Sequence, residues 1–178
     1  MKITKIFNGI VLKKLIKIAG YQGKESVHTR AMQKFISLIK NEFSISFIED
    51  ITSNNKKASD LISQTQNGEI DISYLFTSYF TNLIPELLYL DLPFYFNSKE
   101  EAFNDLNKNL KPLKNDELKN KHNLFLLGFW DNGTRHISSS KKFIHTPKDC
   151  NEQIIRTTPN QLHIDTFKSF GFIPKPLD

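Results

Sequence analysis

Apolar residues in the first half of the chain follow the spacing of β-strands at three places. Residues 15–21 are apolar apart from Lys17, which favours a buried strand, and residues 44–50 alternate between apolar and polar. A third short run, residues 71–76, is apolar apart from Asp71 and Ser73. Each run is short enough for a strand, so we predict three strands in this half.

Helical spacing separates these three runs. Apolar residues at the spacing of one helix face predict a helix over residues 27–42, with Ser26 as its N-cap, and a second helix around Leu61 and Ile62 that Gly68 ends. The resulting order is strand, helix, strand, helix, strand. This order predicts an α/β fold with mostly parallel sheets and helices that cover them.

The second half of the chain is predicted to mix helices and strands as well. Residues 81–96 are apolar and aromatic and are broken by Pro85 and Pro93, which favours a helix followed by buried extended chain over a membrane-surface segment. The further expected elements are helices over 98–110 and 112–121, a strand over 123–131, extended chain over 134–141, a helical turn over 146–151, a strand over 153–157, a helix over 160–170 and a sheet-edge strand at the end of the sequence.

Composition and charge narrow the class of protein. The 178 residues are 39% hydrophobic, which suits one compact domain or two small ones, and the net charge is +5. The lysines are interleaved with Asp and Glu and form no basic block, so we expect no nucleic-acid partner. No apolar run reaches the ~20 residues of a membrane span, and we expect a chain that does not span a membrane. The single cysteine, Cys150, is expected to be a small buried hydrophobe.

The first 14 residues resemble the beginning of a secretory signal. They are basic and then mildly apolar, but the apolar stretch over 6–12 is short, and Lys13 and Lys14 follow it directly. We therefore interpret residues 1–14 as a degenerate or incomplete leader. Export to the periplasm and retention in the cytoplasm both stay open on this sequence.

The sequence contains no motif of a catalytic or metal site. It has no nucleophile-elbow, zinc-protease or phosphate-loop pattern, and its histidines are dispersed. We expect a protein that is not an enzyme and that has no cofactor and no metal.

Two arginines are the candidate binding residues in a chain whose other basic residues, apart from Arg30, are lysines. Arginine presents a planar fork that grips a carboxylate through two hydrogen bonds. Arg156 lies in the predicted strand over 153–157, whose carboxyl end is where open α/β sheets bind ligands. Arg135 follows Asn132 and Gly133, and glycine allows close approach of the backbone to a ligand. We predict a small carboxylate ligand, with Asn132 as a further ligand-binding residue and with Trp130 and the aromatic run from Tyr74 as apolar walls.

Four stretches of sequence, in order, resemble the extracytoplasmic solute-binding proteins of TRAP transporters, the family of the C4-dicarboxylate-binding protein. They are GYQGKESVHTRAMQKF, NGEIDISYLFTSY, IPELLYLDLPFYF and GFWDNGTRHISSSKKFIHTPKDCNEQIIRTTP. The resemblance implies a periplasmic-binding-protein-like fold of two α/β lobes that close over an organic acid, such as a dicarboxylate, and deliver it to the membrane permease subunits. It also implies that Arg156 clamps the ligand carboxylate and that Arg135 is a second ligand-binding arginine.

The resemblance also implies a division of the chain. Residues 15–131 correspond to the first lobe and residues 132–178 to part of the second lobe, which we expect to be incomplete because the chain is shorter than members of the family usually are. An alternative is a truncated remnant or a split-gene fragment without a ligand function of its own. The approach to the arginine strand also departs from the family, because Cys150, Asn151 and Glu152 stand where a glycine is usual.

Overall fold

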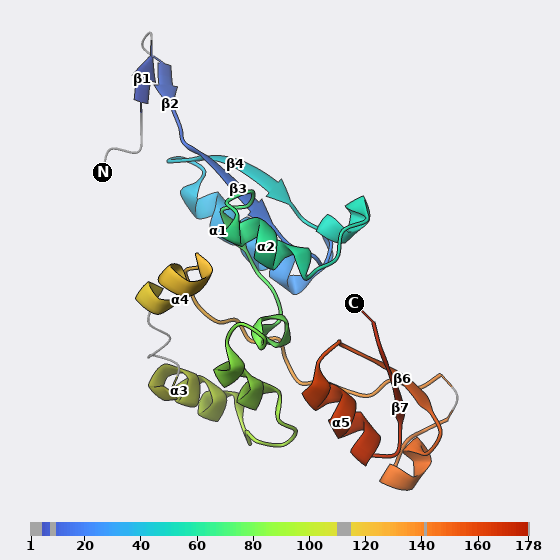
Figure 1. The fold of residues 1–178 in the computed structure, drawn as a ribbon. Coiled ribbons are helices and arrows are strands. Elements are labelled where there is room, and N and C mark those ends of the chain that lie inside the picture. The colour runs from blue at the N-terminus through green and yellow to red at the C-terminus, as the bar shows by residue number, and fades with distance from the viewer. Residues whose placement is uncertain (1–4, 8–9, 110–114, 141, 178) are drawn as a thin grey trace. The chain divides into compact units, whose positions relative to one another are not determined.

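The computed structural model describes residues 5–7, 10–109, 115–140 and 142–177 (Figure 1). The chain divides into two compact units, Met1–Leu75 and Phe76–Asp178, and each is described by itself. The predicted lobe boundary between residues 131 and 132 concerns the family's two-lobe arrangement, and it stays a prediction.

The first unit is built on a parallel sheet of three strands with the order β4-β3-β5. An antiparallel pair of strands precedes this sheet and lies within the predicted leader. The elements are β1 (Lys5–Phe7), β2 (Ile10–Leu12), β3 (Leu15–Ala19), α1 (Val27–Ile39), β4 (Ser44–Ile48), η1 (Ile51–Asn54), α2 (Asp60–Gln66) and β5 (Ile72–Ser73), where η denotes a 3-10 helix.

Local sequence explains these elements. The Ser26 side chain accepts a hydrogen bond from the backbone of His28, so one of the unpaired N–H groups at the start of α1 is satisfied. The core joins strand and helix through four buried apolar side chains, Ala19, Ile51, Leu61 and Ile70. The predicted strands and helices of this half are confirmed, with β5 shorter than expected.

The second unit has a two-stranded parallel sheet, in which β6 pairs with β7, and several helices. A core cluster of Ile84, Leu87 and Leu118 holds its first part together. The elements are η2 (Thr77–Phe80), η3 (Pro85–Asp91), α3 (Lys99–Asn109), α4 (Asn115–His122), η4 (Pro147–Cys150), β6 (Ile154–Thr157), α5 (Gln161–Ser169) and β7 (Ile173–Pro176).

The elements at the end of the second unit agree closely with those predicted from the sequence. The predicted strand, helix and edge strand are present as β6, α5 and β7. The predicted helical turn is η4, where Thr146 and Asp149 cap each other's backbone in a capping box. Cys150 is buried, as expected.

The predicted strand over 123–131 is wrong, because no strand lies there. The backbone N–H and carbonyl of Leu126 are hydrogen-bonded to the side chain of Asn115 and not to a neighbouring strand. The Leu126 N–H donates to Asn115 Oδ1 at 2.8 Å, and Asn115 Nδ2 donates to the Leu126 carbonyl at 3.3 Å. Residues 134–140, which we expected to be extended chain, belong to no helix or strand, and residue 141 lies outside the described residues.

The predicted buried extended chain at the end of segment 81–96 is also wrong. The predicted helix is the 3-10 helix η3, and the residues after it form a turn in which Phe94 has a φ of 58° and is 90% exposed. The second of the two predicted polar helices begins at Asn115, and residues 110–114 lie outside the described residues.

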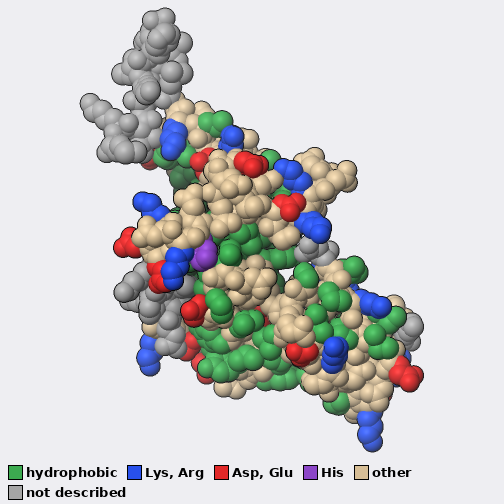
Figure 2. Space-filling view, in the orientation of Figure 1, with side chains coloured by type: hydrophobic (Ala, Val, Ile, Leu, Met, Phe, Trp, Pro, Cys, Tyr) green, Lys and Arg blue, Asp and Glu red, His purple; other side chains and the backbone are tan. Residues whose placement is uncertain are grey.

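Charged side chains are dispersed over the face that Figure 2 shows. On this face, Lys and Arg side chains are scattered among Asp and Glu and do not gather into a basic patch. Among the described residues, no helix is long and apolar enough to cross a membrane.

Candidate functional site

Arg156 lies on the exposed face of strand β6. Side chains alternate along a strand, and here Ile154 and Arg156 are exposed whereas Ile155 is half-buried and Thr157 is buried. Within the described part of the chain, the Arg156 guanidinium makes no hydrogen bond or ion pair. Its donors are therefore without a partner among the described residues.

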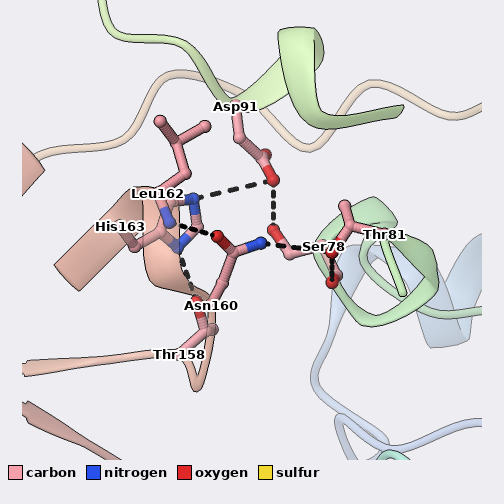
Figure 3. A network of polar contacts seen from close by, with 7 residues as sticks. All are labelled: Ser78, Thr81, Asp91, Thr158, Asn160, Leu162 and His163. Carbon is pink, nitrogen blue, oxygen red and sulfur yellow. Dashed lines mark hydrogen bonds and ion pairs between the residues drawn. The ribbon is translucent and has the colours of Figure 1, made fainter. Parts of the chain in front are cut away.

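The turn from β6 into α5 is held by a buried polar network (Figure 3). Asn160 caps α5, since its Oδ1 accepts from the Leu162 N–H at 2.9 Å, and its Nδ2 lies 3.4 Å from Thr81 Oγ1 on the segment after η2. Thr158 Oγ1 lies 2.5 Å from His163 Nδ1. Two residues of the turn are thus fixed by side chains rather than by a neighbouring strand.

Asp91 joins this network to the 3-10 helices. His163 Nε2 lies 3.7 Å from Asp91 Oδ2, with 8% and 4% of the two side chains exposed, and the Ser78 hydroxyl donates to the same oxygen. Because Ser78 donates to Asp91 and not to His163, these residues do not form a nucleophile with an adjacent base. The network fastens the strand end that carries Arg156 and has no catalytic arrangement.

Arg135 is connected to the same network through Phe76. The guanidinium carbon of Arg135 lies 4.9 Å from the centroid of the Phe76 ring, within the distance of a cation–π contact. The Phe76 ring in turn stacks on His163, with centroids 6.1 Å apart and planes inclined by 27°. Arg135 is exposed, and like Arg156 it forms no ion pair or hydrogen bond with the described residues.

Trp130 and Asn132 lie on the exposed segment that leads to Arg135. Asp131 Oδ1 accepts a hydrogen bond of 2.8 Å from the N–H of Gly133, whose φ of 77° suits glycine. Asp131 also pairs with Lys99 at 2.6 Å, and this hydrogen bond raises the pKa of Lys99. A turn closed by Asp131 therefore sets the path of the chain before Arg135.

Tyr74 lies in the first unit, directly after β5. Its hydroxyl lies 3.1 Å from Thr29 Oγ1, its ring packs near the rings of Tyr21 and His28, and burial raises its pKa. The structure thus places four of the predicted site residues in the second unit and Tyr74 in the first.

The network residues were missed by sequence reasoning. Asp91 and His163 come from distant segments, and dispersed histidines are usually surface or cap residues. Asn160 gave the clearest signal, because it stands where a helix cap is expected before α5. No group of three or more His, Cys, Asp and Glu side chains that could hold a metal ion is present in the described ranges.

The parallel sheets with their accompanying helices define an α/β fold, and strand β6 of one of them carries Arg156. The structure superposes with a TM-score of 0.84 on the sugar acid binding protein DctPAm from Advenella mimigardefordensis in complex with galactonate, at 23% identity, covering 93% of this chain and 54% of that one. This likeness confirms the predicted α/β fold of the periplasmic-binding-protein kind.

Residues 18–178 match the sequence model of bacterial extracellular solute-binding protein, family 7, and the chain belongs to this family. Two relatives are a protein of Haemophilus influenzae, 32% identical over 89% of this chain and 49% of its own length, and the 2,3-diketo-L-gulonate-binding periplasmic protein YiaO of Escherichia coli K12, 31% identical over 83% of this chain and 45% of its own. The chain spans about half the length of the curated relatives it matches. The family is one of solute-binding proteins, which agrees with the expectation of a protein that is not an enzyme.

Proposed function

We propose that this chain is the ligand-binding component of a TRAP-type transporter and that Arg156 clamps the carboxylate of a small organic acid. The observation that carries the proposal is the pair of arginines in the second unit, both exposed and both without an ion pair to a described carboxylate. The contrast is Arg30, which donates to the backbone carbonyl of Glu25 at 3.0 Å.

The proposed ligand is a sugar acid or a dicarboxylate. The names of two similar proteins support an acid of this kind, since one binds 2,3-diketo-L-gulonate and the other holds galactonate. Both are acids with several oxygen atoms beyond the carboxylate. We propose that Arg156 grips the carboxylate, which all these compounds share, and that Arg135 contacts a second oxygen-bearing group.

The proposed partners and location follow from the same family. A solute-binding protein of this kind hands its ligand to membrane permease subunits, and we propose that this chain acts in the periplasm. Trp130, Asn132 and Tyr74 are proposed as further contacts to the ligand.

Titration calorimetry with a panel of galactonate, glucuronate, 2,3-diketogulonate and succinate tests the proposal. We expect at least one acid to bind and Arg156→Gln to weaken its binding about 10- to 100-fold, because each charged hydrogen bond contributes ~1.5–3 kcal/mol. Arg156→Lys keeps the charge but not the fork, and we expect it to recover only part of the loss.

Arg30→Lys is the matched control, because Arg30 lies on α1 and uses its side chain within the fold. We expect it to bind like the wild type. A folded wild-type chain that binds none of these acids would contradict the proposed function, and unchanged binding by Arg156→Gln would contradict the role of Arg156.

A further inference from the structure

The ring of Phe76 is the only described partner that the structure gives to the side chain of Arg135. An exposed arginine at the surface of a segment without helix or strand can adopt many rotamers. The contact with the ring face restricts the guanidinium carbon to a position 4.9 Å from the ring centroid. The hydrogen-bond donors stay without a described partner, because a cation–π contact uses the charge and leaves the donors unpaired.

The Phe76 ring is itself held in place. It stacks on the His163 ring, and both nitrogens of His163 face polar partners, Thr158 Oγ1 at 2.5 Å and Asp91 Oδ2 at 3.7 Å. A buried imidazole with contacts on both sides cannot turn without breaking one of them. The contacts of His163 therefore hold the Phe76 ring in place, and the Phe76 ring in turn holds the Arg135 side chain.

We propose that Phe76 is a positioning residue that holds the guanidinium of Arg135 ready for the ligand. This inference rests on the proposed function, and it assigns Phe76 no ligand contact of its own. Phe76 changes ligand affinity only through Arg135. If the Phe76 ring contacted the ligand directly, it would change ligand affinity whether or not Arg135 was present.

The first test is made without ligand, and it uses the fact that the chain contains three arginines. Protein labelled with ¹⁵N-arginine gives three side-chain Nε–H signals, and Arg135→Lys and Arg30→Lys identify them. A guanidinium over an aromatic face is shifted upfield by the ring current. We expect the Arg135 signal of the wild type to be shifted upfield relative to the Arg30 and Arg156 signals, to lose this shift in Phe76→Leu and to keep it in Phe76→Tyr.

An Arg135 signal at the position of an exposed arginine in the wild-type protein would overturn the proposal. This measurement needs no substitution at Phe76, so it decides even where Phe76→Leu does not fold. It also needs no ligand, so its outcome is independent of the proposed function.

The second test is a double-mutant cycle on ligand affinity. With the tightest acid of the panel, we expect Phe76→Leu to weaken binding about 3- to 10-fold, to match the loss of one partly exposed cation–π contact. In an Arg135→Gln background the same substitution is expected to change affinity less than about 2-fold.

An equal loss in both backgrounds would overturn the proposal, because Phe76 would then act on the ligand without Arg135. Phe76→Tyr, which keeps the ring face, is the matched control and is expected to bind like the wild type. If the wild type binds none of the acids, the proposed function fails, and the NMR measurement alone decides whether Phe76 positions Arg135.

Discussion

Gly20 lies at the end of strand β3 where the ring of Tyr74 approaches the backbone. A Cβ at position 20 would lie 2.6 Å from Tyr74 Cε1 and 2.7 Å from its hydroxyl oxygen. The backbone has little freedom to move away, because the Gly20 N–H donates to the carbonyl of Ile48 at 2.8 Å and its carbonyl accepts from Ile51 at 3.0 Å. Gly20→Ala therefore forces the Tyr74 ring to move.

Moving the ring has two costs. Inserting one methyl group into a packed site costs about 1–3 kcal/mol. A displaced Tyr74 also leaves the hydroxyl of Thr29, which is 0% exposed, without its partner at 3.1 Å, which costs about 1 kcal/mol more. We expect Gly20→Ala to lower the free energy of unfolding by about 2–4 kcal/mol and Tm by roughly 10–30 °C for a unit of this size.

Thermal and urea unfolding followed by circular dichroism measure this loss. The matched control is Gly128→Ala, since nothing lies within 4 Å of a Cβ at that position, and we expect a change of less than about 0.5 kcal/mol. Replacing Tyr74 by Leu removes the clashing atoms, so Gly20→Ala is expected to cost less than about 0.5 kcal/mol in a Tyr74→Leu background. Equal costs of Gly20→Ala in the two backgrounds would refute the steric argument.

Two further predictions concern the second unit. Asn160→Ala removes the cap of α5 and the contact with Thr81, and we expect urea unfolding to show a loss of about 1–2 kcal/mol, whereas Asn160→Asp keeps the cap and loses less. The pKa of Asp149 is lowered below its usual value of 3.8 by hydrogen bonds from Thr146 and His145. Its stabilising contribution is therefore present above pH 3.8 and is lost as the pH falls through the lowered pKa. The stability difference between the wild type and Asp149→Asn should shrink over that acidic range, and a difference that stayed constant would contradict the assignment.

The regular elements of both units could be predicted because they depend on periodic apolar residues and local caps. The parallel strands of the first unit, and β6, α5 and β7 of the second, each carry such a pattern. Segment 123–131 carries the pattern of a strand too, but a single side chain, Asn115, satisfies the backbone at Leu126. Hydrophobic spacing cannot reveal a hydrogen bond between a side chain and a backbone that lie in different segments.

The candidate site could be predicted only in part for the same reason. Arg156 and Arg135 stood out because arginine is rare in this chain, whereas Asn160 was missed although it precedes a helix. The buried contacts that hold these residues join Ser78, Asp91 and His163, which are far apart in the sequence. The spacing of such polar residues along the sequence does not distinguish residues of a buried network from residues on the surface.

The carboxylate clamp is tested most directly at the guanidinium of Arg156 itself. The measurement is a titration of ¹⁵N-arginine-labelled protein with the acid that binds most tightly in calorimetry. We predict that the Arg156 side-chain signal shifts and saturates at the ligand concentration that calorimetry gives, while the Arg30 signal stays in place because Arg30 is held by Glu25 on the first unit. An Arg156 signal that stays unchanged while the acid binds would contradict the account.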